Sequence, residues 1–305
     1  MSWLDHDSYI EICPPEPFDF SECLVFLARS DQEVSHRIKG DHLYKLIKLD
    51  DELVLLKIGM KQKMLNVEFL GKPPSSSIRK KATAYVWDWF DFDSNLGEFY
   101  DFAARDKVLK PLIDNFYGLR IMGISDLFEA IAWAITGQQI NLTFAYTLKK
   151  RFAYQYGESL TFENESYWLF PSYEKIAGLD VEDLRALQFS VRKAEYIIEV
   201  AKTLAQGQWT RNTLLAKIDD DEIRNLLMSI RGIGAWTADL VMMRCLHRVN
   251  AFPFADVGLH NALKIHLGLA RKPSIVEVKE MTATWDGWYA YATFYLWRLL
   301  YEHHA

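Results

Sequence analysis

A loop rich in proline and serine, GKPPSSS at residues 71–77, divides the chain into two stretches with different patterns of apolar residues. Before the loop lie three short apolar-rich runs of strand length, and the last of them alternates apolar and polar residues at a period of two. These runs read HLYKLIKL at 42–49, ELVLLKIG at 52–59 and MLNVEFL at 64–70. After the loop, apolar residues recur at helical spacing almost throughout. The switch predicts an α+β fold that is mainly α.

The predicted domain boundary lies somewhat beyond this loop. We expect a β-rich N-terminal domain over residues 1–105, with one helix at 20–29, and a helical region over residues 106–305. Several helices of this region have a polar side chain at their predicted start, which caps the first free N–H groups. These starts are Asp126 with Glu129, Asn141, and Ser274 with Glu277.

The cysteine count and the apolar runs exclude several classes of protein. Three cysteines, Cys13, Cys23 and Cys245, are too few and too scattered for a disulfide framework or for the four thiolates of an iron–sulfur cluster. No apolar run reaches the length of a membrane span, and the N-terminal residues lack the pattern of a signal peptide. We therefore expect a cytoplasmic protein.

The charge balance argues against a surface that binds nucleic acid over its whole extent, because the formal net charge is −6. A local site remains open, since backbone amides and a few lysines can bind phosphate. The chain is also rich in aromatic residues, with ten tryptophans. Such rings fill the core in most proteins, and a binding cleft lined with rings is the second interpretation.

The sequence SIRGIGAWTADLVMM at residues 229–243 joins two predicted helices, 219–230 and 235–247, through Gly232-Ile233-Gly234. Glycine accepts a positive φ and lets a second backbone approach closely. The N-terminus of the second helix offers free N–H groups and the positive end of the helix dipole, where a phosphate fits without a lysine. The two glycines alone are equally typical of a tight corner between packed helices.

The longer sequence resembles the helix-hairpin-helix of the DNA glycosylase superfamily, with both glycines, Ile233, Thr237 and Ala238 in place. The resemblance covers most of the chain and is greatest to alkylation-repair enzymes of the DNA-3-methyladenine glycosylase II type. It implies a helical body of two subdomains with the active-site cleft between them. Further matching segments are PFDFSECLVFL (17–27), FEAIAWAITGQQI (128–140), FSVRKAEYIIEVA (189–201), FPFADVGLHNAL (252–263) and WDGWYAYATFYLW (285–297).

Asp256 is the candidate catalytic residue. From its neighbours alone, an aspartate before VGLHNAL is a good helix N-cap. The resemblance makes it the catalytic aspartate, and both roles are compatible, since a helix N-terminus favours negative charge. Cleavage of an N-glycosidic bond builds positive charge on the deoxyribose. A fixed carboxylate stabilises that charge and orients or deprotonates the attacking water.

The residue type at position 236 distinguishes two kinds of glycosylase. Bifunctional relatives carry a lysine nucleophile two residues after the second glycine, where it forms a Schiff base. Trp236 stands at that position here, which favours a monofunctional enzyme. The alternatives are an oxidised-purine glycosylase/lyase and a non-catalytic helix-hairpin-helix DNA-binding protein.

The resemblance also implies a substrate pocket. A target base must leave the stack to be cut, and aromatic walls suit electron-poor alkylated purines. Trp236 and Trp297 are the expected walls, and Phe26 is a further candidate; ordinary core packing is the alternative for each ring. Leu240 stands where well-known members place a tyrosine.

Double-stranded DNA containing alkylated bases is the expected partner of a monomeric enzyme. The resemblance implies no required cofactor, only a monovalent cation (Na⁺ or K⁺) held by the backbone carbonyls of Met228, Ile230 and Ile233. Either Gln139 or Ile140 would fill the gap left by the flipped base. The expected DNA-binding residues are Gly232, Ile233, Gly234, Ala235 and Thr237 of the hairpin, and Gln138, Gln139 and Ile140.

Overall fold

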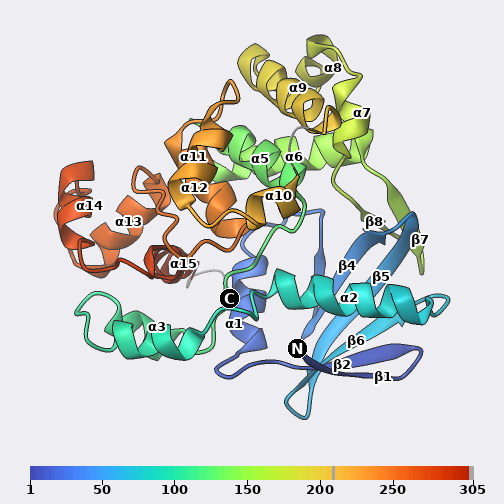
Figure 1. Cartoon of the computed structure of the whole chain (residues 1–305), viewed down its shortest axis with the longest axis horizontal. Helices are drawn as coiled ribbons and strands as arrows, with labels where there is room; N and C mark the ends of the chain where they lie inside the picture. The colour runs from blue at the N-terminus through green and yellow to red at the C-terminus, as the bar shows by residue number, and fades with distance from the viewer. Residues whose placement is uncertain (208–209, 302–305) are drawn as a thin grey trace. The chain divides into compact units, whose positions relative to one another are not determined.

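The computed structural model describes residues 1–207 and 210–301 (Figure 1). The chain forms two compact units, and each is assembled from segments that are distant in sequence. Unit 1 comprises Met1–Pro15, Ser30–Asp93 and the described part of Ile135–Gln208. Unit 2 comprises Glu16–Arg29, Ser94–Ala134 and the described part of Trp209–Ala305. The predicted division of the chain at residue 105 stays a prediction.

A six-stranded antiparallel sheet in the order β1-β2-β6-β5-β4-β3 forms the centre of unit 1. Three of its strands are those predicted from the apolar runs. Leu43, Ile58 and Val67 face one another across the register and are all fully buried, so they form one apolar row. The strands are β1 (Ser2–Asp5), β2 (Tyr9–Cys13), β3 (Arg37–Lys39), β4 (His42–Leu49), β5 (Glu52–Lys61) and β6 (Met64–Leu70).

Helix α2 (Ser76–Trp89) lies across this sheet and contacts β2 and β4 (Figure 1). It begins inside the loop that divides the sequence, where the Ser75 side chain accepts a hydrogen bond from the Ile78 N–H. Ile78, Ala82 and Val86 are buried and recur at a spacing of four. The helix therefore packs one apolar stripe on the sheet.

The rest of unit 1 contains a β-hairpin that the sequence analysis did not predict. Strands β7 (Ser159–Phe162) and β8 (Glu165–Trp168) are joined by Glu163 and Asn164, both with positive φ, as a two-residue turn of the I′ kind requires. The accompanying helices are α6 (Leu142–Tyr156), α7 (Tyr173–Ala177), α8 (Val181–Arg185) and α9 (Val191–Ala205).

Unit 2 is helical. Its helix α15 (Tyr289–Leu299) is buried on most of its surface, from Ala290 to Leu296, and packs against α13 and α4. A helix that is apolar on several faces lies in the core of its unit. The other helices are α1 (Phe20–Leu27), α3 (Leu96–Ala103), α4 (Lys110–Asn115), most of α5 (Leu127–Gly137), α10 (Arg211–Leu215), α11 (Asp220–Met228), α12 (Ala235–Arg244), α13 (Val257–His266) and α14 (Ile275–Met281).

The predicted helix caps are present. Asn141 accepts a hydrogen bond from the Phe144 N–H at 2.8 Å, and Ser274 forms a reciprocal capping box with Glu277. Asp126 accepts one from the Glu129 N–H at 2.6 Å. Within residues 1–207 and 210–301, no helix combines the length and the apolar character needed to cross a bilayer.

Candidate active site

The Gly-Ile-Gly sequence forms the turn between α11 and α12. Gly232 has a φ of +94°, which other residues rarely adopt, so the turn requires glycine there. Gly234 has a φ of −96° and precedes α12 as its N-cap, with no side chain to cap the helix. A Cβ added at Gly234 would meet no protein atom within 4 Å. The two glycines therefore serve different purposes. Gly232 allows the positive φ of the turn, and Gly234 leaves the N-terminus of α12 uncovered by a side chain.

Asp256 is held by three N–H donors. As the N-cap of α13, it accepts a hydrogen bond from the Leu259 N–H to Oδ1 at 2.8 Å. Trp297 Nε1 donates to the same oxygen at 2.8 Å, and Trp236 Nε1 donates to Oδ2 at 3.1 Å. The fold thus brings together the three side chains that the sequence analysis placed at the reacting centre, from α12, α13 and α15.

These donors fix the carboxylate in one orientation. A carboxylate has about four lone-pair directions, two on each oxygen. Oδ1 accepts two hydrogen bonds, whereas Oδ2 accepts one from the described part of the chain. Asp256 is only partly buried. One lone pair of Oδ2 is therefore positioned to face a water molecule or a substrate.

Gly258, which the sequence analysis did not select, makes room for this arrangement. An added Cβ would lie 2.9 Å from Asp256 Oδ1 and 3.3 Å from Trp297 Nε1. Glycine inside a helix costs up to about 1 kcal/mol relative to alanine. The chain carries that cost at the point where the indole N–H must reach the carboxylate. A glycine two residues after the aspartate was the available signal.

Two phenylalanines pack next to Trp297, one against the other. The Phe294 ring lies 6.3 Å from Trp297 and 4.2 Å from Phe26. Phe26 is only 2% exposed, and the Arg244 guanidinium lies 5.5 Å from its ring. Phe26 is thus packed inside unit 2, and its place in a pocket wall stays a prediction. Leu240, one turn after Trp236 on α12, is partly exposed.

Tyr301 is a second residue that the sequence analysis missed. Its ring meets that of Phe26 edge-on at 6.0 Å. Burial raises the pKa of the Tyr301 phenol, the negative charge of Asp256 adds to this effect, and Arg29 and Arg244 oppose it. The phenol therefore lies within electrostatic range of the candidate catalytic carboxylate.

Unit 1 contains the loop predicted to enter the DNA. Gln139 is exposed and has a φ of +55°, whereas Gln138 and Ile140 are partly buried. Lys193 Nζ donates to the Thr136 carbonyl at 2.7 Å, just before this loop. Burial lowers the pKa of Lys193. The lysine of α9 therefore anchors the residues from which the loop starts.

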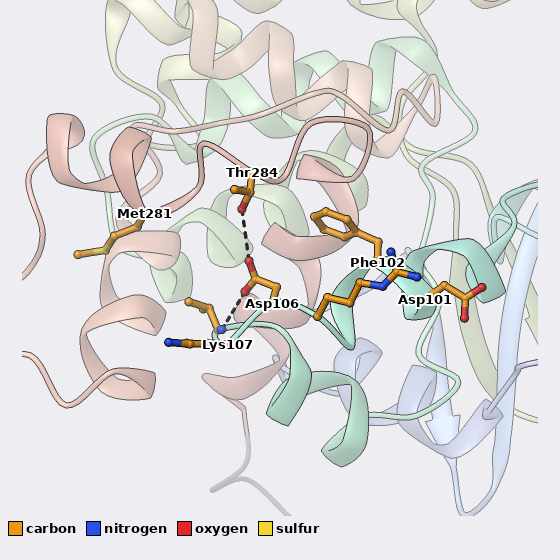
Figure 2. A pocket seen from close by; sticks show the side chains of 8 residues that line it. Asp101, Phe102, Asp106, Lys107, Met281 and Thr284 are labelled. Carbon is orange, nitrogen blue, oxygen red and sulfur yellow. Dashed lines mark hydrogen bonds between the residues drawn. The ribbon is translucent and has the colours of Figure 1, made fainter.

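A separate pocket of about 640 Å³ lies in unit 2 between the end of α3 and α14. Asp106 is one of its lining residues, and Figure 2 shows the Thr284 hydroxyl directed at this carboxylate. Asp106 also accepts a hydrogen bond from Trp285 Nε1 at 3.0 Å, so its carboxylate holds a buried tryptophan of the same unit in place. None of the predicted site residues lines this pocket, which is formed by Asp101, Phe102, Arg105, Asp106, Lys107, Val108, Met281 and Thr284.

Two protein families match this chain. Residues 132–286 match the HhH-GPD superfamily base excision DNA repair protein, and residues 11–131 match the 8-oxoguanine DNA glycosylase N-terminal domain. Among similar sequences, the DNA-3-methyladenine glycosylase of Bacillus subtilis is 41% identical over 304 residues, 99% of this chain and 100% of its own length. The DNA-3-methyladenine glycosylase 2 of Escherichia coli is 29% identical over 59% of this chain and 60% of its own.

Solved structures agree in fold. The 3-methyladenine DNA-glycosylase of Archaeoglobus fulgidus has a TM-score of 0.80 and 24% identity over 97% of this chain and 98% of its own. The Clostridium acetobutylicum 8-oxoguanine glycosylase/lyase, solved in complex with double-stranded DNA, has a TM-score of 0.78 and 17% identity over 100% and 99%. With a family match over half of its length and a full-length relative at 41% identity, the chain belongs to the HhH-GPD superfamily of base excision DNA repair proteins.

Proposed function

We propose that this protein is a monofunctional DNA glycosylase that excises alkylated purines such as 3-methyladenine from double-stranded DNA, acting as a cytoplasmic monomer. The observation that carries the proposal is the Asp256 carboxylate, held by the indole N–H groups of Trp236 and Trp297. The name of the full-length Bacillus subtilis relative, DNA-3-methyladenine glycosylase, supports the substrate class.

The proposed mechanism uses few groups. As the bond to the flipped base breaks, positive charge develops on the deoxyribose, and the Asp256 carboxylate stabilises it. The open lone pair of Oδ2 orients the attacking water and can accept its proton. The partly exposed rings of Trp236 and Trp297 stack on an electron-poor base. A purely DNA-binding protein needs no carboxylate fixed in this way.

Trp236 also argues against lyase chemistry. A Schiff base requires a primary amine, whereas the indole nitrogen of Trp236 is not nucleophilic and donates its hydrogen to Asp256. The oxidised-purine alternative is therefore disfavoured. The likeness to the glycosylase/lyase structure, at 17% identity, is a likeness of fold.

Base release with an intact abasic product is the first expected result. The purified protein should release 3-methyladenine and other alkylated purines from methylated duplex DNA, and strand breaks should form only after heat or alkali. Borohydride added during turnover should trap no covalent protein–DNA adduct. A trapped adduct would contradict the monofunctional mechanism, and no release of alkylated base by folded protein would contradict the proposed function.

DNA binding is proposed to rest on two local surfaces, because the net charge of −6 disfavours general attraction to phosphate. One is the uncapped N-terminus of α12, with Gly232, Ile233, Gly234, Ala235 and Thr237 around the turn. The other is the loop of Gln138, Gln139 and Ile140. Gln139 is exposed and has a left-handed backbone, which favours it over Ile140 as the residue that fills the gap left by the base.

The two glycines of the turn should respond differently to alanine. Gly234→Ala meets no protein atom, so the melting temperature should fall only by the small amount that a poorer N-cap costs. DNA affinity should fall, because the methyl group obstructs a phosphate at the helix N-terminus. Gly232→Ala should lower both, since its φ of +94° costs about 1–2 kcal/mol for a residue with a Cβ. Calorimetry and titration of an abasic duplex measure the two quantities. Unchanged affinity in Gly234→Ala would contradict phosphate binding at this turn.

A monovalent cation at the hairpin fits the backbone. Met228 ends α11, where carbonyls lack partners within the helix, and Ile233 precedes the N-cap of α12. The Ile230 carbonyl accepts one hydrogen bond from the Ile233 N–H at 3.1 Å and retains its second lone pair. Such oxygens suit Na⁺ or K⁺, which would add positive charge beside a phosphate. Within the described residues, no cluster of His, Cys, Asp or Glu forms a metal site.

A further inference from the structure

Lys193 of α9 is a lysine in an unfavourable setting. Its side chain is half-buried, and no carboxylate in the described part of the chain pairs with its ammonium group. It lies in the first turn of α9, where the N-cap Ser190 accepts a hydrogen bond from the Lys193 N–H. The first turn of a helix favours negative side chains over positive ones. Burial and position therefore both disfavour a lysine here.

The Lys193 ammonium compensates for this setting at the end of another helix. Its Nζ donates a hydrogen bond to the Thr136 carbonyl at 2.7 Å. Thr136 is the last residue but one of α5, where carbonyls lack donors within the helix and carry the negative end of its dipole. The bond thus joins the start of α9 to the end of α5, across 57 positions of sequence.

The loop assigned to DNA, residues 138–140, begins two residues after Thr136. At its far end the Asn141 side chain caps α6 by accepting a backbone N–H of that helix at 2.8 Å. Gln139, in the middle, has a φ of +55°, a conformation that few residues with a Cβ adopt. A short loop with an uncommon backbone is therefore held at one end by the Asn141 cap and at the other by Lys193.

We propose that Lys193 is a positioning residue that holds the loop 138–140 in the form that fills the gap left by a flipped base. The proposal rests on the proposed glycosylase function. Extrusion of a paired base costs free energy, and a residue that enters the gap offsets part of that cost. A loop that is loose at its start would lose conformational freedom on entering the DNA, whereas an anchored loop has already lost it. The lysine would thus favour the flipped state without touching the reacting bond.

Stability is a weak explanation for this lysine. Buried charges in proteins are usually paired with an opposite charge, because the loss of water is costly. Here a neutral carbonyl takes the place of the opposite charge. An apolar side chain at position 193 would avoid the loss of water, and it would not hold the end of α5. Anchoring of the loop therefore accounts for a feature that stability does not.

The test compares one lesion in two duplexes, using the full-length protein. 7-Methylguanine is placed opposite cytosine, or opposite an abasic site, where it has no partner to leave. In single-turnover excision at saturating protein, Lys193→Met should be about tenfold to a hundredfold slower than wild type opposite cytosine. Opposite the abasic site it should come within about threefold of wild type, because an unpaired base flips at least cost.

The matched control is Lys202→Met, which removes the same charge from an exposed position of the same helix. It should keep the wild-type rate on both duplexes. A Lys193→Met protein that is equally slow on both duplexes, or as fast as wild type on both, would overturn the proposal. If Lys193→Met does not fold, Lys193→Gln takes its place, with the same two outcomes against the proposal.

A double variant tests whether Lys193 acts through the loop. With Gln139→Ala already present, Lys193→Met should slow excision opposite cytosine by no more than about threefold, because residues that act through one contact are not additive. A further loss as large as that in the wild-type background would contradict this route.

A binding experiment keeps the proposal testable if the wild-type protein releases no alkylated base, in which case the proposed function fails. 2-Aminopurine beside an abasic site brightens when its neighbours unstack, so its fluorescence reports entry of the loop into the DNA. At saturating protein, a smaller rise with Lys193→Met than with Lys202→Met supports positioning, and an equal rise overturns it.

Discussion

Asp256→Asn is expected to excise alkylated bases about a hundredfold to a thousandfold more slowly than the wild-type enzyme, or slower still. Asparagine is a good helix N-cap, so its oxygen can still accept from the Leu259 N–H and α13 should begin normally. The negative charge is lost, however, and the amide NH₂ then faces the Trp236 N–H, so that two donors meet where a donor met an acceptor. The variant therefore removes the charge and leaves the helix start in place.

Single-turnover assays on methylated DNA measure this loss. Circular dichroism and the melting temperature report whether the fold is retained, and binding to an abasic duplex reports whether DNA recognition is retained. Asp256→Ala serves as a comparison, because it should also lose about 1 kcal/mol of stability with the N-cap. A folded Asp256→Asn enzyme that works at the wild-type rate would remove Asp256 from the mechanism.

Gly258→Ala should separate stability from activity. Alanine is the better helix former, so the free energy of unfolding should be unchanged or slightly higher. Its Cβ would lie 2.9 Å from Asp256 Oδ1, and the atom that must move is the catalytic carboxylate together with the Trp297 N–H that orients it. A shift of about 1 Å in a reacting group can slow a reaction by about a hundredfold. We expect a stable protein with a rate reduced to that extent.

The control for this variant is a glycine with room for a methyl group. Gly178 ends α7, and a Cβ there would come no closer than 3.8 Å to another atom, the Lys175 carbonyl oxygen. Gly178→Ala should therefore leave the excision rate unchanged. If Gly258→Ala also keeps the wild-type rate, the hydrogen bond between Trp297 and Asp256 is not needed for the reaction.

Local features of the fold were predictable from the sequence. Strand alternation and helix capping involve residues a few positions apart, so β4 and β6 and the cap at Asn141 follow from neighbouring residues alone. The hairpin β7–β8 was missed because its strands have four residues each and their apolar side chains are held by distant partners. Leu160, Phe162 and Tyr167 pack with Leu46 and Leu55 of the six-stranded sheet.

The candidate site was predictable in membership and less so in geometry. Asp256 has a local signal as an N-cap, and the resemblance selected Trp236 and Trp297 as rings. Their hydrogen bonds to Asp256 span 20 and 41 positions, so only the packing of α12, α13 and α15 brings the groups together. The Phe26 ring packs against that of Phe294, and its place in the pocket wall stays a prediction. Helix α12 ends at Arg244, three residues before the predicted end, and His247 then adopts a φ of +51°.

The discontinuous composition of unit 2 has a consequence for the order in which the protein can fold during synthesis. Helix α1 leaves the ribosome early, yet its Glu22 pairs with Arg298, which lies 276 positions later. Phe26 likewise has no ring partner in α15 until Phe294 is made. Contacts between residues so far apart form late, because a long loop must close first. Unit 2 therefore cannot complete its core until the last helix has been translated, and the site around Asp256 and Trp297 is among the last parts of the enzyme to assemble.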